Sequence, residues 1–215
     1  MEGVILRNSL KYWEMRLRAN MPASLRRAYR MVGGLRRPRT AEPLPVELLA
    51  ECRFCPSREM MLEVLPKGGA VCELGTYRGE FAREIVKTSR PSELHLVDID
   101  YSQFDPEGLE GTHIHLHTGL THEVIATFPQ AHFDWVYIDA DHSYEGCLRD
   151  AQAAAAHVRP GGYIIFNDFA HIDPWMGQYG VHRAATDFAR EANWPMAFFS
   201  YNRHGLYDAA FRKPN

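Results

Sequence analysis

Short apolar runs alternate with amphipathic segments from residue 57 onward, and this alternation defines the fold class. The apolar runs predict strands at 70–74, 93–98, 113–117, 133–139 and 163–167. The spacing of apolar residues between them predicts helices at about 57–65, 79–89, 121–128, 143–158 and 181–192. Strands that alternate with helices form a parallel sheet with helices on both faces.

The end of the chain departs from this alternation. Two strands are predicted near 195–201 and 205–212, and the turn at 202–205 contains the glycine that is typical of a hairpin. A separate turn is predicted at 159–162, where Pro160 is followed by two glycines. We therefore expect an α/β, Rossmann-like doubly wound sheet, mostly parallel, that closes with an antiparallel C-terminal hairpin.

Charge divides the chain into two parts. Residues 1–40 carry ten basic and two acidic side chains, whereas residues 41–215 carry 14 basic and 25 acidic ones. Apolar residues at helical spacing in 1–34 predict two short amphipathic helices. We expect a basic helical extension and linker over 1–45 and one folded domain over 46–215. The extension could pack on the domain, mediate homo-oligomerisation or, less simply, lie on an anionic membrane surface.

Composition excludes several classes of protein. The net charge of -3 argues against nucleic-acid binding by the whole chain. The sequence has no apolar run long enough for a transmembrane helix and no apolar core of a secretory signal near its start. Cys52 and Cys55 form a CxxC without the second pair that a zinc site needs. These features predict a cytoplasmic protein with free thiols.

Ligands of such open sheets bind beyond the carboxyl ends of the strands. The first predicted strand ends in Glu73-Leu-Gly75-Thr-Tyr77-Arg-Gly79, which lacks the G-x-G-x-x-G spacing of dinucleotide-binding proteins. The two glycines let a ligand approach the backbone or simply serve a tight turn. Glu73 could accept hydrogen bonds from a cationic or hydroxylated ligand. Asp98 ends the second strand at a spacing typical of acids that bind ribose hydroxyls.

Oxygen-bearing side chains also follow the fourth and fifth predicted strands. Asp139, Asn167 and Asp168 would lie at the tips of two neighbouring strands, where they suit Mg²⁺ or act as helix caps and loop acids. His142 follows Asp139 by three residues and could be a general base or a capping residue. His113, His115 and His117 share one strand face, which could bind a metal but is better explained as an exposed face.

Taken together, these motifs resemble those of the class I S-adenosylmethionine-dependent methyltransferases. The segments Ile138–Gly146 and Gly180–Phe188 look most like the metal-dependent O-methyltransferases of the catechol and caffeoyl-CoA type and the bacterial enzymes that methylate antibiotic sugars. The resemblance implies cofactor-binding roles for Glu73, Gly75, Tyr77, Gly79, Asp98, Gly119 and Asp139. It implies Mg²⁺ ligands at Asp139, Asn167 and Asp168, with His142 and Asp139 as the catalytic residues.

The resemblance implies transfer of a methyl group to a hydroxyl of a small molecule, a sugar or an aromatic acceptor, with Mg²⁺ acidifying that hydroxyl. His142 would remove the proton. A metal-independent O- or N-methyltransferase is the alternative. A nicotinamide-dependent oxidoreductase and a non-catalytic binding module that works through the basic extension are weaker hypotheses. The sequence does not name the acceptor.

Overall fold

The computed structural model describes residues 22, 25, 41–173, 177–201 and 206–215. Most of the predicted extension, and the predicted turn at 202–205, lie outside these residues. By its internal contacts the chain divides into a larger unit, Thr40–His171 with Tyr179–Asn215, and a smaller one, Met1–Arg39 with Ile172–Gln178. No helix in the described part of the chain is long and apolar enough to cross a membrane.

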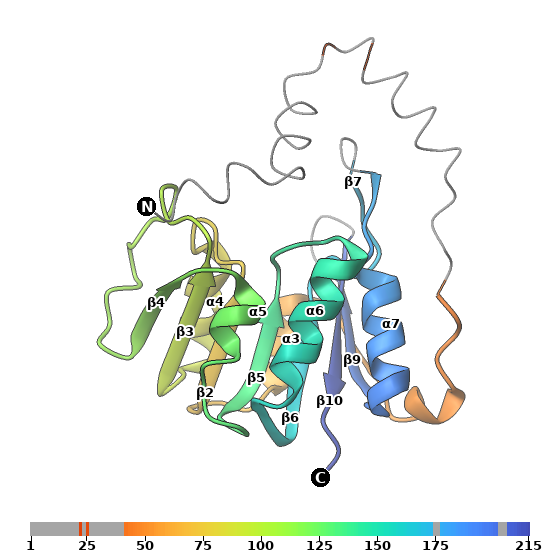
Figure 1. Ribbon diagram of the computed structural model, residues 1–215. Helices are drawn as coiled ribbons and strands as arrows, with labels where there is room; N and C mark the ends of the chain where they lie inside the picture. The colour runs from red at the N-terminus through yellow and green to blue at the C-terminus, as the bar shows by residue number, and fades with distance from the viewer. Residues whose placement is uncertain (1–21, 23–24, 26–40, 174–176, 202–205) are drawn as a thin grey trace. The chain divides into compact units, whose positions relative to one another are not determined.

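The larger unit contains an eight-stranded sheet in the order β1-β9-β10-β6-β5-β2-β3-β4 (Figure 1). Its strands are β1 (Arg53–Cys55), β2 (Ala70–Leu74), β3 (Glu93–Asp98), β4 (Ile114–Thr118), β5 (Phe133–Ile138), β6 (Val158–Phe166), β9 (Met196–Tyr201) and β10 (Tyr207–Arg212). Every neighbouring pair is parallel except those of β10, which is antiparallel to both β9 and β6. The expected mostly parallel sheet with an antiparallel hairpin is confirmed.

Helices cover both faces of this sheet, as the alternation of the sequence predicts. They are η3 (Val46–Leu48), α3 (Arg58–Val64), α4 (Glu80–Ser89), α5 (Thr121–Ile125), α6 (Tyr144–Ala155) and α7 (Val181–Ala192). Figure 1 shows α5, α6 and α7 on one face and α3 and α4 on the other. Each face has its own cluster of buried apolar side chains. Central strand β5 is buried along its whole length, which explains its nearly continuous apolar sequence.

Several predicted boundaries are wrong. The predicted turn at 159–162 belongs to β6, which starts at Val158 and carries an irregularity opposite Phe133–Trp135. Helices α5 and α6 end three residues earlier than predicted. Strand β1 was not predicted, because three residues ahead of Pro56 give too short a pattern. In the smaller unit, β7 (Ile172–Asp173) and β8 (Gly177–Gln178) form an antiparallel pair.

Candidate active site

The carboxyl ends of the strands lie along one edge of the sheet because the strands are parallel, and backbone hydrogen bonds continue past them. The amide of Gly75 donates to the carbonyl of Val97 at 2.8 Å, and that of Asp139 donates to Leu74 at 2.7 Å. The amide of Asn167 donates to Ile138 at 3.0 Å. Residues that are far apart in the sequence therefore lie in register at this edge. Strands β2 and β5 are neighbours, but the chain continues from β2 to β3 on one side and from β5 to β6 on the other. Their carboxyl ends therefore form the topological switch point where such sheets bind ligands.

Glu73 lies inside β2, next to this switch point, and is 1% exposed. Its Oε2 atom is buried and has no hydrogen-bond partner. Burial, and then the nearby charge of Asp139, raise the pKa of Glu73 well above its ordinary value. A buried carboxylate oxygen without a donor is costly unless a ligand supplies one. A cationic ligand group such as an ammonium would supply the donor that Glu73 lacks.

Asp98 ties the loops after β2 and β3 together at the same edge. Its Oδ2 accepts a hydrogen bond from the amide of Tyr77 at 2.7 Å, and its Oδ1 accepts one from the amide of Asp100 at 3.1 Å. Each carboxylate oxygen can accept a further bond, so both remain able to bind ribose hydroxyls. Gly119 lies beside them, because its amide donates to the carbonyl of Asp98 at 3.0 Å. The predicted roles of Asp98, Tyr77 and Gly119 in cofactor binding remain predictions.

Position 75 requires a glycine because the loop after β2 packs closely against the loop after β5. It has a φ of +93°, and a Cβ atom there would lie 2.2 Å from the carbonyl oxygen of Asp139. Gly79 is the N-cap of α4, with a φ of +77°. Both glycines therefore have structural reasons to be glycine, in addition to the ligand access expected from the sequence.

His142 and Asp139 form a pair beyond the end of β5. The imidazole Nε2 lies 3.2 Å from the Asp139 Oδ1, and the imidazole is largely buried. Burial by itself disfavours the charged imidazole, but the carboxylates of Asp139, Asp168 and Asp141 outweigh it and raise the pKa of His142. Neither residue is a helix cap, since Ser143 caps α6 by accepting the amide of Gly146 at 3.1 Å.

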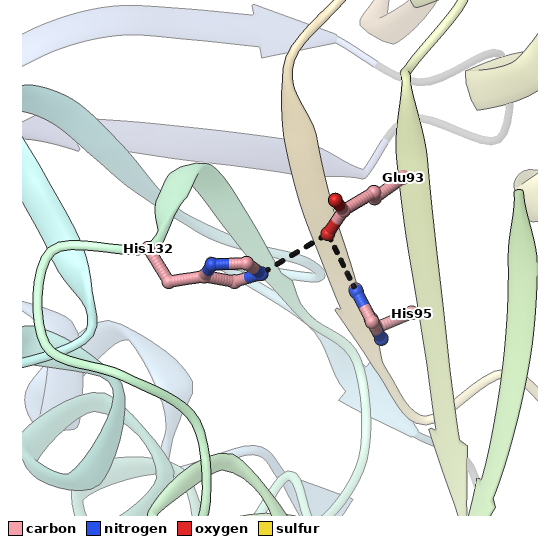
Figure 2. Close-up of side chains that lie close together, drawn as sticks. All are labelled: Glu93, His95 and His132. Carbon is pink, nitrogen blue, oxygen red and sulfur yellow. Dashed lines mark hydrogen bonds and ion pairs between the residues drawn. The ribbon is translucent and has the colours of Figure 1, made fainter.

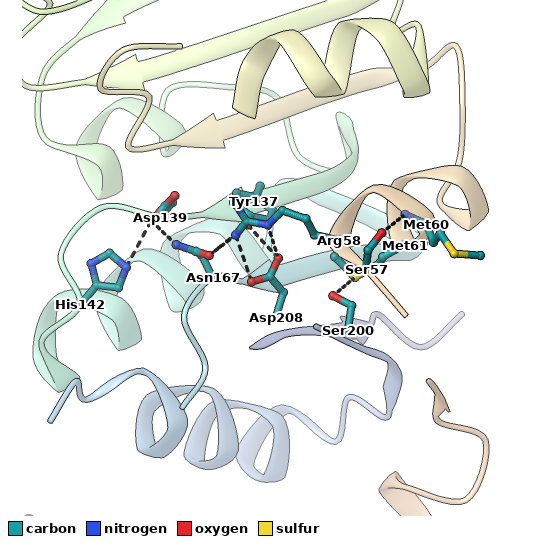
Figure 3. Close-up of polar contacts among 10 residues, drawn as sticks. All are labelled: Ser57, Arg58, Met60, Met61, Tyr137, Asp139, His142, Asn167, Ser200 and Asp208. Atoms are coloured by element: carbon teal, nitrogen blue, oxygen red, sulfur yellow. Dashed lines mark hydrogen bonds and ion pairs between the residues drawn. The ribbon is translucent and has the colours of Figure 1, made fainter. Parts of the chain in front are cut away.

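A network of polar side chains continues from Asp139 into the protein (Figure 3). The amide nitrogen Nδ2 of Asn167 donates to Asp139 Oδ1 at 2.5 Å. The guanidinium of Arg58, the first residue of α3, donates to the amide oxygen of Asn167 and, at 2.6 Å, to the hydroxyl of Tyr137. Arg58 Nε also donates to Asp208 Oδ2 at 3.1 Å, and the side chain of Asp208 is fully buried.

Sequence patterns did not identify Arg58, Tyr137 or Asp208 as part of the site. The nearest signal is the acid at 208, which stands alone in an apolar strand and therefore needs a partner. That partner lies 150 residues earlier in the chain. Local patterns cannot reveal a contact across such a separation.

The three predicted Mg²⁺ ligands come together but do not form an oxygen-lined site. The oxygen of Asn167 already accepts hydrogen bonds from Arg58 and Tyr137, and its nitrogen faces Asp139. The permanent positive charge of Arg58 also opposes a cation at this position. Asp168 is half-buried, and burial, followed by the charge of Asp139, raises its pKa. This arrangement does not fit Mg²⁺ coordinated by all three residues.

Comparison with known proteins agrees with this fold. Residues 72–169 match the family model described as a methyltransferase domain. NodS, an N-methyltransferase from Bradyrhizobium japonicum WM9 solved with S-adenosyl-l-homocysteine, is 16% identical, with a TM-score of 0.55 over 74% of this chain and 85% of that one. The pyocyanin biosynthetic protein PhzM is 11% identical, with a TM-score of 0.58 over 72% of this chain and 53% of that one. No curated protein matches the sequence.

A third similar structure is the putative methyltransferase solved in complex with the Trm112 methyltransferase activator of Haloferax volcanii. It is 13% identical to this chain, with a TM-score of 0.56 over 71% of this chain and 86% of that one. At such low sequence identities, the structural similarity supports a shared fold only.

The family match and the Rossmann-like sheet together identify a methyltransferase domain in this chain. The family match places the methyltransferase domain over residues 72–169 of this chain, which include Glu73, Asp98, Asp139 and His142. The chain thus contains the domain of a methyl-transferring enzyme.

Proposed function

We propose that the enzyme transfers the methyl group to a hydroxyl of a small molecule, with His142 as the general base. The observation that carries this proposal is the His142–Asp139 pair at the edge of the sheet that also contains Glu73. A hydroxyl must lose its proton as it is methylated, and a buried imidazole beside a carboxylate is suited to accept it. Asp139 would stabilise the imidazolium that forms.

Bound S-adenosylmethionine supplies a methyl group that its sulfonium already activates. The residues of this chain would hold and align the reactants, which can contribute about 7–11 kcal/mol to lowering a barrier. Glu73 would bind the ammonium of the cofactor, and Asp98 its ribose hydroxyls. The structure of NodS with S-adenosyl-l-homocysteine supports binding of this cofactor on a similar fold.

We further propose that the reaction does not need Mg²⁺. The metal-dependent mechanism requires two or three oxygen ligands at the strand tips. The oxygen of Asn167 is occupied by Arg58, whose guanidinium supplies positive charge there without a metal. Arg58 would thus do part of the electrostatic work that a metal does in the metal-dependent branch.

Calorimetric titration with S-adenosylhomocysteine, in Mg²⁺ and then in EDTA, tests the cofactor first. Methyl transfer to a panel of catechols and sugars, with and without EDTA, then tests the reaction. We expect binding and turnover that EDTA leaves unchanged, and a loss of about 10²- to 10⁴-fold in kcat for His142→Ala. His122→Ala, a half-buried histidine in α5, is the matched control. Activity that requires Mg²⁺, or product methylated on nitrogen, would refute the corresponding part of the proposal.

A further inference from the structure

Two histidines and a glutamate converge at the opposite end of the sheet (Figure 2). Glu93 is the first residue of β3, His95 is the third, and His132 directly precedes β5. The Oε2 atom of Glu93 lies 3.4 Å from His95 Nε2 and 3.3 Å from His132 Nε2. One donor atom from each of the three residues lies within 4.8 Å of the others.

This cluster is separate from the candidate active site. Glu93 and His132 lie where β3 and β5 begin, whereas Asp98 and Asp139 lie where the same two strands end. Methyl transfer uses none of the three residues in the function proposed above. Among the described residues, this is the place where three histidine, cysteine or carboxylate side chains could hold a metal ion.

Two of the three distances between donor atoms match those of tetrahedral zinc. Zinc binds histidine nitrogen and carboxylate oxygen at about 2.0–2.2 Å, so two ligand atoms of a tetrahedral site are about 3.3–3.5 Å apart. The two measured distances from Glu93 Oε2, 3.4 and 3.3 Å, have this value. Imidazole nitrogen is also the ligand type that suits zinc, copper and nickel.

The surroundings of His95 favour a ligand role. Its Nδ1 lies 3.0 Å from the Nε2 of His117 on β4, which permits the tautomer in which Nδ1–H donates to His117 and leaves Nε2 free for a metal. Metal-binding histidines generally use their second nitrogen in this way. The ring is sheltered by Phe128 and Phe133.

The other two side chains leave the site open to solvent. Glu93 is 47% exposed and His132 is 25% exposed, whereas His95 is 10% exposed. A metal could therefore enter without unfolding the domain, and water could complete its coordination. Without a metal, the same contacts would be hydrogen bonds between imidazole N–H groups and the carboxylate of Glu93.

We propose that Glu93, His95 and His132 bind a divalent transition metal ion of the zinc type, at a site independent of methyl transfer. A metal there would join the start of β3 to the loop that leads into β5. It would therefore stabilise the folded domain, because the unfolded chain does not hold the three ligands together.

The test is calorimetric titration of the metal-free full-length protein with Zn²⁺, together with thermal unfolding in the presence and absence of Zn²⁺. We expect one ion per chain and a higher Tm with Zn²⁺. Loss of a supporting residue alone typically costs about 10- to 100-fold in affinity, so His132→Ala and Glu93→Gln should each weaken binding at least about tenfold. These two side chains are partly exposed, and their replacement should leave the fold intact.

Three control variants separate this site from others. His122→Ala and Glu123→Gln remove the same side-chain types from α5 and should leave Zn²⁺ affinity unchanged. His142→Ala should also leave it unchanged, which distinguishes the cluster from the candidate active site. Absence of stoichiometric Zn²⁺ binding would overturn the proposal. So would binding that survives unchanged in both His132→Ala and Glu93→Gln, or binding that is lost in His142→Ala.

Discussion

The guanidinium of Arg58 donates a hydrogen bond to the amide oxygen of Asn167, and this contact fixes which way that amide faces. With its oxygen toward Arg58, the amide presents its nitrogen to Asp139. The Oδ1 atom of Asp139 that faces His142 is thereby also held by the Asn167 amide. An arginine at the start of α3 thus orients the Asp139–His142 pair through one intervening side chain.

Removal of the Arg58 side chain should strongly destabilise the protein. In Arg58→Met, the fully buried carboxylate of Asp208 loses its ion pair, which typically costs about 3–5 kcal/mol. The double variant Arg58→Met with Asp208→Asn should lose less than the sum of the two single variants. Urea unfolding measures the free energy of unfolding of the two single variants and the double variant. Lys67→Met breaks the exposed pair with Glu63 and should cost less than about 1 kcal/mol. Equal losses in Arg58→Met and Lys67→Met would contradict the buried-pair interpretation.

Replacement of Glu73 should change stability and cofactor affinity in opposite directions. Glu73→Gln removes a buried charge that has an unpaired oxygen, so the Tm of the cofactor-free protein should rise. The same change removes an ionic acceptor for the cofactor, and a hydrogen bond to a charged group contributes about 1.5–3 kcal/mol. Affinity for S-adenosylhomocysteine in calorimetry should therefore fall about 10- to 100-fold. Exposed Glu80→Gln is the control, and a Glu73 variant with unchanged affinity would exclude the ligand role.

Asp150 should make stability depend on pH. Burial is the main cause that raises its pKa in the folded protein from 3.8 to about 6, and its Oδ2 has no partner. Protonation between pH 6 and pH 4 therefore favours the folded state, whereas above pH 6 the buried charge opposes folding. Asp150→Asn is neutral throughout, so it should be more stable than the wild type by roughly 2 kcal/mol at pH 8.

This advantage of Asp150→Asn should disappear below pH 4. Denaturant unfolding at pH 8, 6 and 4 measures it, with exposed Glu110→Gln as the control. An advantage that grows toward acidic pH has the wrong sign and would refute the interpretation.

Substitutions at Gly75 and Gly108 should distinguish the stability cost of backbone strain from the cost of a steric clash. Both have positive φ, +93° and +76°, but a Cβ at Gly108 would meet nothing within 4 Å, whereas one at Gly75 would meet the carbonyl of Asp139. Gly108→Ala should therefore cost about 1–2 kcal/mol through strain alone. Gly75→Ala should cost about 3 kcal/mol or more. Equal losses in chemical denaturation would show that the contact with Asp139 relaxes freely.

Sequence patterns predict the parts of the fold that depend on local periodicity. The ranges of β2, β3 and α7 agree residue for residue, because each has a clear apolar repeat and a clear stop. Strand β6 was predicted to start five residues too late, because a proline followed by two glycines ordinarily marks a turn. In the folded sheet that segment continues beside β5, a pairing that no local rule describes.

The candidate site could be predicted only where its residues follow from the positions of the strand ends. Asp139 and Asn167 follow buried strands, so their meeting at one edge follows from strand order. The network that ends at Asp208 was not predictable, because it depends on contacts between the first helix of the domain and its last strand. The cluster of His95 and His132 depends likewise on residues brought together only by the folded sheet.

Strand β10 connects two portions of the sheet in the part of the chain that the structure describes. In the order β1-β9-β10-β6, the strands β1 and β9 reach the rest of the sheet through β10. The same strand carries Asp208 to Arg58. During synthesis on the ribosome, β2 through β6 can pair before β10 has left the exit tunnel, but the network around Asn167 cannot. The active-site network would thus be completed only after the scaffold that carries it, so a ribosome-stalled chain lacking β10 should retain much of the sheet and no activity.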